Sequence, residues 1–511
     1  MSDTPTKSSS ETSSDEAACE LPVPVALATS PSGSAHIDFE PGAAKQSPSA
    51  GSSSSSILRQ LVLLAAPVMA ETLLHTVVGL NDTYLANHLP PDPAASTAAV
   101  GTVMYFFWFI GLFSGAIGTG ATALIARATG AKEPERATTL CAQALLIAGV
   151  MGVLLGAAFF MLADVLVYAT GLPGAGSTLG ASPIPGTSAA LAASYFRYLS
   201  WGVPFVVILA VANAALRGSG DTVRPAIAMI VVGICTITLT NVFIQGMFGL
   251  PKLGFVGLAI GTAIPYALGA GLQLALLFSH RLRLRPTPAM LVPHPVELSR
   301  LLKIGLPAGA ENLLMWSANF VLLRIINQLD NTAASAAAHA NAIRLEALSF
   351  MTGFAVSVAA ASLVGQKLGA GDVQGARRVA HMAWCLGGGI MCAMGLSFLA
   401  LPGAYANFLS EDPRVISLTT QCLFIAGFCQ LGFSAAIVYG GALRGAGDTF
   451  VVMVMTLASI LLLRVCGVLI VTQVFGGGLS AVWWVLAADL TMRGTLAYWR
   501  FSTGRWAKIK I

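Results

Sequence analysis

An apolar stretch at residues 58–85 carries three side chains that could bind and pass a proton, Glu71, His75 and Asp82. At about 100° per residue, a helix turns by about 40° net between Glu71 and His75, and by about 20° net between Glu71 and Asp82. All three groups therefore lie along one stripe of one helix. A stripe of titratable groups in an apolar helix predicts a proton path. The alternative for Asp82 is a wetted position near the helix end, where it would help to cap the local backbone.

Three motifs in the chain occur twice and in the same order. Ala-Pro-Val-Met-Ala-Glu-Thr-Leu-Leu at 66–74 aligns with Leu-Pro-Ala-Gly-Ala-Glu-Asn-Leu-Leu at 306–314, so Glu311 mirrors Glu71 at 311 − 71 = 240 residues. Gly-Ala at 130–131 returns at 369–370, an offset of 369 − 130 = 239 residues. Ala-Leu-Arg-Gly-Ser-Gly-Asp-Thr at 215–222 returns almost unchanged at 442–449, 442 − 215 = 227 residues later. These repeats predict a duplicated domain, which is the usual construction of secondary transporters.

Composition indicates that both copies are embedded in lipid. Of the 511 residues, 55% are hydrophobic and 10% are charged, and the mean hydropathy is +0.75. Soluble domains carry about 25% charged residues, so this chain cannot cover itself with polar surface. A net charge of +5 with no basic patch gives no sign of nucleic-acid binding.

Apolar runs between Gly- and Pro-rich breaks predict twelve membrane-spanning helices. The predicted spans are 58–85, 97–122, 137–168, 190–214, 223–247, 255–280, 300–327, 333–361, 377–402, 415–440, 450–475 and 479–503. Lys and Arg concentrate in every second loop and at both ends of this map, which predicts that both termini face the cytoplasm. The repeats then divide the chain into a six-helix lobe at 57–285 and a second at 286–511, two parallel copies related by an axis along the membrane normal. Residues 1–56, rich in Ser, Thr and Pro, are expected to form a disordered cytoplasmic tail.

The motifs resemble the multidrug and toxic compound extrusion (MATE) family over about residues 57–505. Pro67 and Pro307 match the Pro in the first helix of each lobe, and Val-Gly-Gln-Lys-Leu-Gly-Ala at 364–370 matches the turn after helix 8. The two Leu-Arg-Gly turns match those after helices 4 and 10. The resemblance implies an all-α integral membrane protein with twelve helices in two lobes, related by a pseudo-two-fold axis, around a V-shaped central cavity.

The same resemblance selects residues for proton coupling. Asn81-Asp82-Thr83 matches the first-helix motif whose Asp binds the proton in the family. Asn241, in Asn-Val-Phe-Ile-Gln-Gly at 241–246, matches a fifth-helix Asn or Asp that lies beside it. Glu71 and His75 are the other candidates on this path, although Glu71 could instead bond a neighbouring helix and Asn241 could make an ordinary interhelical hydrogen bond.

Sodium-coupled members carry acids in helices 7 and 10, where this chain has Met315 and Phe433. This departure favours protons, although Glu311 could substitute from one turn earlier. Glu311, Arg344 and Glu346 form a candidate cation or substrate site of the second lobe, with an interhelical network of Arg344, Glu346 and Arg464 as the alternative.

The repeated turns are interpreted as structural or gating elements. Arg217 and Arg444 are expected to bond the carbonyl ends of helices, and Asp221 and Asp448 to cap the helices that follow. No phosphate-binding Gly-x-x-x-x-Gly-Lys loop accompanies them.

Together these features predict an antiporter that exports organic, often cationic, compounds in exchange for protons by alternating access. The alternatives are a sodium-coupled exporter and a lipid-linked oligosaccharide flippase of a related family, which would line its cavity with more cationic residues. We expect no enzymatic activity, no metal and no cofactor other than the coupling ion. The expected surroundings are the bilayer of a bacterial inner membrane and small organic substrates, with the protein as a monomer.

Overall fold

The computed structural model describes residues 54–89, 92–176, 178, 180–249, 251–279, 282–330 and 334–509, and these contain helices, turns and loops but no β-strand. The first half comprises α1 (Ser54–Ala86), α2 (Pro93–Gly130), α3 (Pro134–Met161), α4 (Ala163–Thr170), α5 (Ser188–Ser200), α6 (Val203–Gly218), α7 (Val223–Gln245) and α8 (Val256–Phe278). The second comprises α9 (Pro295–Ile326), α10 (Ala334–Gly369), α11 (Val373–Ala400), α12 (Pro402–Leu409), α13 (Pro413–Gly445), α14 (Thr449–Ser459), α15 (Cys466–Leu469) and α16 (Leu479–Ser502).

The twelve predicted spans all appear as helices in the described residues, with some corrections. Because α1 begins at Ser54, the helix starts inside the predicted tail of 1–56, whose remaining residues lie outside the described part. The predicted span 190–214 is divided between α5 and α6, which meet at 56°. Pro204 at the start of α6 has no N–H to donate to the preceding turn, which accounts for the break. The predicted span 450–475 contains two rare π-helical stretches, η3 (Ile460–Val465) and η4 (Ile470–Val474).

Within the described residues, nine helices are long and apolar enough to cross a membrane, and the bent pair α5 and α6 makes ten. The helices α9 and α16 complete the set of twelve but fall outside this group. Both carry charged or amide side chains in mid-helix, Glu311 and Asn319 in α9 and Asp489 and Arg493 in α16. Polar groups at membrane depth need partners inside the protein, so the contacts of these four side chains decide whether α9 and α16 can span lipid.

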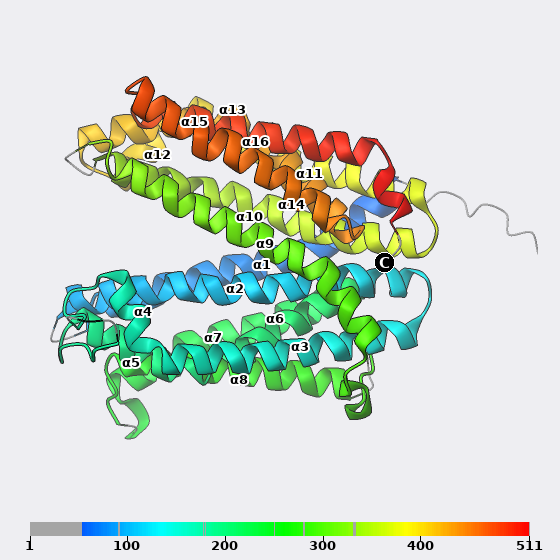
Figure 1. Ribbon diagram of the computed structural model, residues 1–511, viewed down its shortest axis with the longest axis horizontal. Helices are drawn as coiled ribbons and strands as arrows, with labels where there is room; N and C mark the ends of the chain where they lie inside the picture. Colours follow the sequence, from blue (N-terminus) through cyan, green and yellow to red (C-terminus); the bar gives the residue numbers. More distant parts are fainter. Residues whose placement is uncertain are drawn as a thin grey trace, which may run out of the picture. The chain divides into compact units, whose positions relative to one another are not determined.

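The helices form two bundles whose apolar cores exchange a segment. Figure 1 shows the helices of the first half grouped below those of the second half. The first part of α1 belongs to the core of the second half, through buried Ile57, Leu61, Ala65 and Val68. In return, the first part of α9 belongs to the core of the first half, through Leu301 and Ile304. Each helix contains a proline close to the point where it changes bundle, Pro67 in α1 and Pro307 in α9.

The halves approach most closely at the end of the helices that carries the turns 217–222 and 444–449, here named the turn end. The helix ends of α2 and α10 meet there without side chains between them. A Cβ on Gly130 would lie 1.9 Å from the carbonyl oxygen of Gln366, and a Cβ on Gly369 would lie 2.0 Å from that of Arg127. Only glycine permits so close an approach of two backbones.

Hydrogen bonds between the halves close the turn end. From the second half, Ser362 Oγ donates to the Arg217 carbonyl at 2.6 Å and Gln366 Nε2 donates to the Gly218 carbonyl at 3.0 Å. From the first half, Arg127 Nη2 donates to the Ala446 carbonyl at 3.2 Å. Arg127 and Gln366 are repeat equivalents, since 366 − 127 = 239 residues. Each half therefore donates a side-chain hydrogen bond from this equivalent position to the turn of the other half. These two bonds, from Arg127 and from Gln366, are named the latches.

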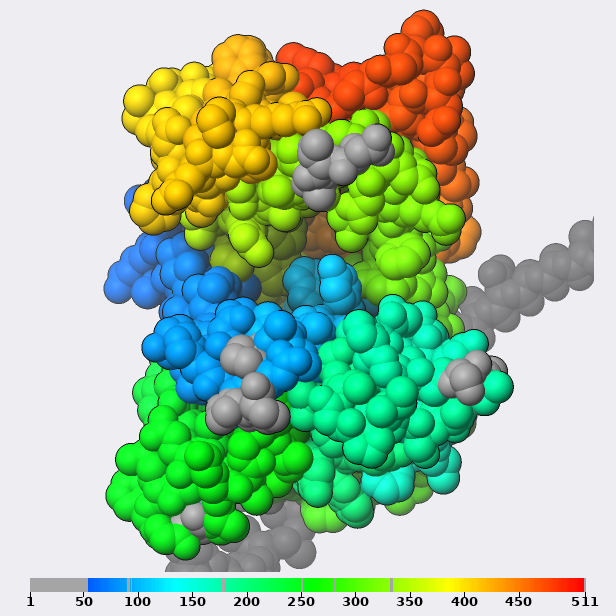
Figure 2. Space-filling view, turned by 90° about the vertical axis from the view of Figure 1, so that its left-hand side faces the viewer, coloured from blue at the N-terminus to red at the C-terminus, as the bar shows by residue number. Residues whose placement is uncertain are grey.

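The other end of the helices is open. Figure 2 looks onto the end that carries α4, α5 and α12 and shows a hollow between the first half, in blue to green, and the second half, in yellow-green to red. The arrangement is thus sealed at the turn end and accessible from the opposite end, with the hollow between the two lobes.

We expect Gly130→Ala and Gly369→Ala each to destabilise the protein by about 1–3 kcal/mol, because the added methyl group overlaps a backbone carbonyl across the halves. Gly111→Ala in α2 is the matched control, since nothing lies within 4 Å of its Cβ position. Thermal unfolding midpoints of the three purified variants in detergent measure the effect. Equal midpoints for all three would contradict the close approach at the turn end.

Candidate functional site

Two equivalent ion pairs connect the first helix of each half to its repeated turn. In the first half, Arg217 Nη1 at the end of α6 donates to Glu71 Oε2 in α1 at 2.9 Å. In the second half, Arg444 at the end of α13 binds Glu311 in α9 through two bonds of 2.7 and 3.2 Å. All four side chains are largely buried. The duplication therefore preserves a Glu–Arg pair. Among the described residues neither arginine bonds the carbonyl end of a helix, which corrects the prediction.

The two aspartates of the turns have different roles. Asp221 Oδ1 accepts a hydrogen bond from the backbone N–H of Arg224 at 3.2 Å, so it caps the start of α7 as predicted. Asp448 makes no side-chain cap to α14, which corrects the prediction. Its carboxylate instead accepts from Arg500 Nε in α16 at 2.7 Å, a charge-assisted hydrogen bond.

Asp82 lies deep in the first half and has few partners. Asp82 is 5% exposed. Its one hydrogen bond among the described residues is a long one of 3.5 Å, which its carboxylate accepts from Asn81 Nδ2. Tyr195 in α5 and Tyr266 in α8 are close enough to interact with it electrostatically. The structure therefore buries this carboxylate with no cation bonded to it in the described part.

Asn241 does not reach Asp82. Its Nδ2 donates to the Ile237 carbonyl one turn earlier in α7 at 2.8 Å, and no hydrogen bond joins the two side chains in this structure. The sequence pattern places Asn241 in the correct helix and half, since α7 packs against α1. An amide held by its own helix can rotate to a new partner, but the arrangement here is a local bond.

A small cavity lies beside Glu71, between α1, α7 and α8. Its volume is about 10 Å³, which is room for about one water molecule. Glu71, His75, Thr236 and Tyr266 contribute its polar lining. Tyr266 lines this cavity from α8. His75 lines the cavity but remains exposed, whereas Glu71 and Asp82 point into the bundle.

The tyrosines beside Asp82 escaped the sequence analysis. Tyr195 and Tyr266 belong to apolar helices and are both buried, so nothing in their sequence context separates them from core residues. Their hydroxyl groups are the signal that could have identified them, because a buried phenol needs a polar partner.

The family assignment follows from a match over most of both halves. The model of the MatE family matches residues 67–243 and 307–470, more than half of the chain. The two stretches contain both Glu–Arg pairs, Asp82 and both copies of the turn. The chain belongs to the MATE family. It is therefore an integral membrane transporter, and its two six-helix bundles are the two lobes of that fold.

Relatives of this MATE chain cover nearly its whole helical region. The chain is 29% identical over 452 residues to a probable multidrug resistance protein NorM of Thermotoga maritima, covering 88% of this chain and 94% of that protein. The MATE transporter VcmN of Vibrio cholerae in its bent form has a TM-score of 0.78 at 19% identity, covering 88% of this chain and 97% of that one. An outward-facing MATE family transporter has a TM-score of 0.77 at 22% identity, covering 89% and 99%. At these identities the solved structures support the fold alone.

The carboxylate of the Glu–Arg pair has more hydrogen-bond donors in the second lobe of the MATE chain than in the first. Glu311 Oε1 also accepts from Thr456 Oγ1 at 3.1 Å, so three donor atoms surround this carboxylate. The repeat equivalent of Thr456 is Met229, since 456 − 227 = 229, and a thioether donates no hydrogen bond. Met229 instead lines the small cavity beside Glu71. The first lobe thus leaves room for water where the second lobe supplies a hydroxyl.

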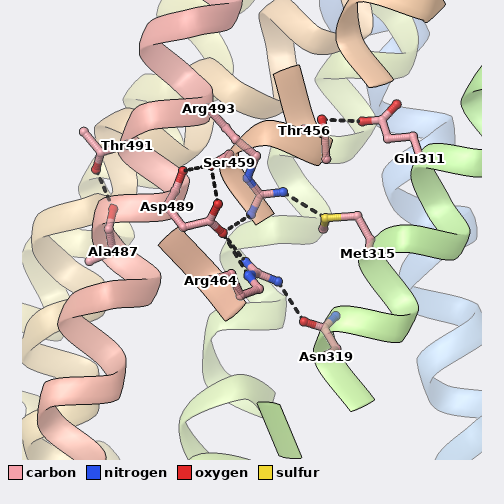
Figure 3. Close-up of polar contacts among 10 residues, drawn as sticks. All are labelled: Glu311, Met315, Asn319, Thr456, Ser459, Arg464, Ala487, Asp489, Thr491 and Arg493. Atoms are coloured by element: carbon pink, nitrogen blue, oxygen red, sulfur yellow. Dashed lines mark hydrogen bonds and ion pairs between the residues drawn. The ribbon is translucent and has the colours of Figure 1, made fainter. Parts of the chain in front are cut away.

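The predicted second-lobe site of Glu311, Arg344 and Glu346 does not assemble. Arg344 is exposed and makes no hydrogen bond to either acid among the described residues. Glu346 faces into the lobe, where it interacts electrostatically with Arg464. Arg464 bonds Asp489 and Asn319 instead of Glu346, as Figure 3 shows, so the predicted network of Arg344, Glu346 and Arg464 is wrong in two of its three members.

We expect Glu71→Gln to destabilise the first lobe by about 3–5 kcal/mol, because it leaves Arg217 buried without its counter-charge. Replacing both partners with methionine should recover most of that loss, since the uncompensated charge is then absent. Thermal unfolding of the single and double variants measures the difference. A double variant that is less stable than Glu71→Gln would contradict an ion pair whose main role is charge compensation.

Proposed function

We propose that this MATE chain exports organic compounds from the cell in exchange for protons, with Asp82 as the proton-binding group. The proposal rests mainly on the environment of Asp82. A buried carboxylate without a bonded cation is costly in lipid, and a bound proton removes the charge that burial disfavours. Glu71, by contrast, has Arg217 at 2.9 Å and is stabilised as an ion.

The shape of the two lobes supports alternating access. The proposed orientation puts the turn end in the cytoplasm, because the basic loops gather there. The structure then corresponds to a state open to the outside and sealed towards the cytoplasm by the latches of Arg127 and Gln366. A proton arriving from outside at Asp82 would favour one state and a substrate the other, which is sufficient for coupling.

The passage of α1 from one lobe to the other offers a route from protonation to movement. Asp82 lies in the part of α1 that packs in the first lobe, and residues before Pro67 pack in the second. A shift of α1 on neutralisation would therefore change contacts in both lobes at once. Small organic substrates would bind in the hollow between them, in keeping with the multidrug resistance proteins to which the chain is similar.

Sodium coupling is the second candidate, and the second lobe argues against it. Sodium needs several oxygen ligands, whereas Glu311 is already occupied by Arg444 and Thr456. Met315 and Phe433 stand where sodium-coupled members carry acids. A bacterial inner membrane is the proposed location, with the protein acting as a monomer.

We expect Asp82→Asn to reduce proton-driven export by at least about a hundredfold while leaving the unfolding midpoint close to that of the original protein, since amide and protonated acid have nearly the same shape. The measurement is ethidium transport in everted membrane vesicles under an imposed pH gradient and, separately, a sodium gradient. Asp164→Asn is the control, because this aspartate forms a partly exposed pair with Arg197 at the far end of the first lobe. Full export by the Asp82 variant, or export by the original protein under the sodium gradient alone, would overturn proton coupling.

A further inference from the structure

A second, larger cavity lies at the turn end of the first lobe. Its volume is about 390 Å³, which falls within the range of about 300–1,000 Å³ that small-molecule sites occupy. Three segments enclose it, namely the first part of α1, the first repeated turn with the start of α7, and the residues 282–283 that follow α8. Its inner wall is apolar, because Leu216 and Leu282 are buried members of the core of the first lobe. The cavity therefore combines a fixed apolar wall with the polar rim of the turn.

The charged groups of the rim are two arginines and one aspartate. Arg224 forms an ion pair with Asp221, and about half of its side chain is exposed. Arg283 is exposed and makes no hydrogen bond or ion pair in the described part of the chain. No other acid among the described residues lines the cavity. The rim thus carries one positive charge more than it compensates, and Arg283 holds that charge.

The first part of α1 adds a further basic group and no acid. Arg59 is exposed and lies one turn before Leu63, which lines the cavity, so both residues occupy the same side of the helix. The next acid along α1 in the described residues is Glu71, which Arg217 already compensates at 2.9 Å. The electrostatic character of this edge of the protein is therefore basic.

An exposed apolar stripe runs from the cavity along α7. Its first residue, Val223, lines the cavity and is 55% exposed. Spacings of four, three and four residues continue it on one face of the helix, through the exposed side chains of Ile227, Ile230 and Ile234. On a membrane-spanning helix such a face contacts the acyl chains of lipid. The cavity consequently lies where the lipid-facing surface ends and the basic groups begin.

The equivalent turn of the second lobe lacks these features. The position equivalent to Arg224 is Val451, since 224 + 227 = 451, and the position equivalent to Leu63 is Lys303, since 63 + 240 = 303. Asp448 is buried and already accepts a hydrogen bond from Arg500. The second lobe thus satisfies its turn internally, whereas the first lobe presents an arginine without a partner in the described part of the chain.

The walls of the cavity come from both lobes. Leu64 packs against the core of the second lobe, because the first part of α1 belongs to that core. The turn belongs to the first lobe, and its Thr222 Oγ1 donates to the Leu63 carbonyl at 3.5 Å. Gln366, which forms one of the latches, has its Nε2 3.0 Å from the Cβ position of Gly220 in the cavity wall. Separation of the lobes at the turn end would therefore take the cavity apart.

We propose that this cavity binds the headgroup of an anionic phospholipid and that the bound lipid favours the state sealed at the turn end. Arg283 and Arg224 would bond the phosphate, and an acyl chain would follow the stripe of α7. Basic pockets between membrane helices on the cytoplasmic side suit such headgroups. Because the cavity is complete only in the sealed state, the lipid binds that state more tightly and shifts the equilibrium towards it. This regulation goes beyond export, and it uses only the orientation of the proposed function.

The first test measures thermal unfolding of the purified full-length protein in mixed micelles. Phosphatidylglycerol should raise the unfolding midpoint by about 2–4 °C more than phosphatidylcholine with the same acyl chains. Arg283→Gln should lose most of this difference and keep the original midpoint in phosphatidylcholine, since it removes no internal contact. Arg283→Lys should retain part of the difference, because an ammonium group still attracts phosphate.

The matched control is Arg378→Gln. Arg378 is an exposed arginine of α11 at the same end of the helices, and it lies outside the cavity lining. This variant removes the same charge and should keep the full effect of phosphatidylglycerol. A loss as large as that of Arg283→Gln would show a general attraction of the basic surface for anionic lipid and would overturn the site.

The second test measures amide hydrogen exchange in lipid nanodiscs, with and without phosphatidylglycerol in a phosphatidylcholine bilayer. Exchange in the segments 217–222 and 366–372 should slow by about three- to tenfold with the anionic lipid, because these segments open when the lobes separate there. Arg283→Gln should show no such slowing. Neither measurement requires transport, so failure of the proposed export function would leave this result intact.

Three outcomes would overturn the proposal. An equal effect of phosphatidylglycerol on the original protein and on Arg283→Gln would remove the headgroup from this cavity. An equal rise in midpoint with glycerol 3-phosphate at the same concentration would assign the cavity to a soluble phosphate compound instead of a lipid. A rise that depends on Arg283 but leaves exchange at the turn end unchanged would contradict the preference for the sealed state.

Discussion

The two Glu–Arg pairs hold the fold together at the point where each lobe's first helix changes bundle. Glu71 and Glu311 each lie one turn after the proline of a helix that begins in the opposite lobe. Because Arg217 and Arg444 end the helices that precede the repeated turns, each pair links a crossing helix to a turn. The same turns accept the hydrogen bonds that seal the lobes together. A disturbance at either carboxylate would therefore reach the closed end of the transporter through one side chain.

The buried polar groups differ between the two lobes, and the bilayer as a solvent explains why each group needs its particular partners. The bilayer offers no water to buried charges, so every ionised group at membrane depth needs a partner within the protein. In the second lobe, α9 and α16 are too polar to qualify as spans by composition, and their polar residues are the ones that bond one another through Asp489, Arg464 and Arg493. In the first lobe the corresponding space holds a small cavity and a carboxylate without a cation. The two copies have thus diverged into one lobe with an acid that no cation bonds and one lobe in which a buried aspartate is bonded by two arginines.

Much of the architecture could be predicted from the sequence because it depends on chain-wide patterns. The twelve apolar runs, the repeated turns and the alternation of basic loops are features of many residues, and the helices follow them closely. The sequence also selected Asp82, Glu71 and Glu311 as acids within membrane-spanning helices, since acids in apolar runs are rare. Their partners could not be predicted, because a contact such as Arg217 to Glu71 joins residues 217 − 71 = 146 positions apart. In the sequence, the arginines of the turns resemble residues of exposed loops, and Tyr266 resembles a residue of the hydrophobic core.

The exchange of the first segments of α1 and α9 between the two cores has an evolutionary consequence. Such a reciprocal exchange is what a symmetric dimer shows when two identical chains swap their leading helices. A six-helix ancestor of one lobe would have left an apolar groove vacant unless a second copy filled it. Fusion of two copies into one chain then made that pairing permanent, and it allowed the two copies to accumulate different charges. We therefore expect a lobe that is expressed separately to form a homodimer.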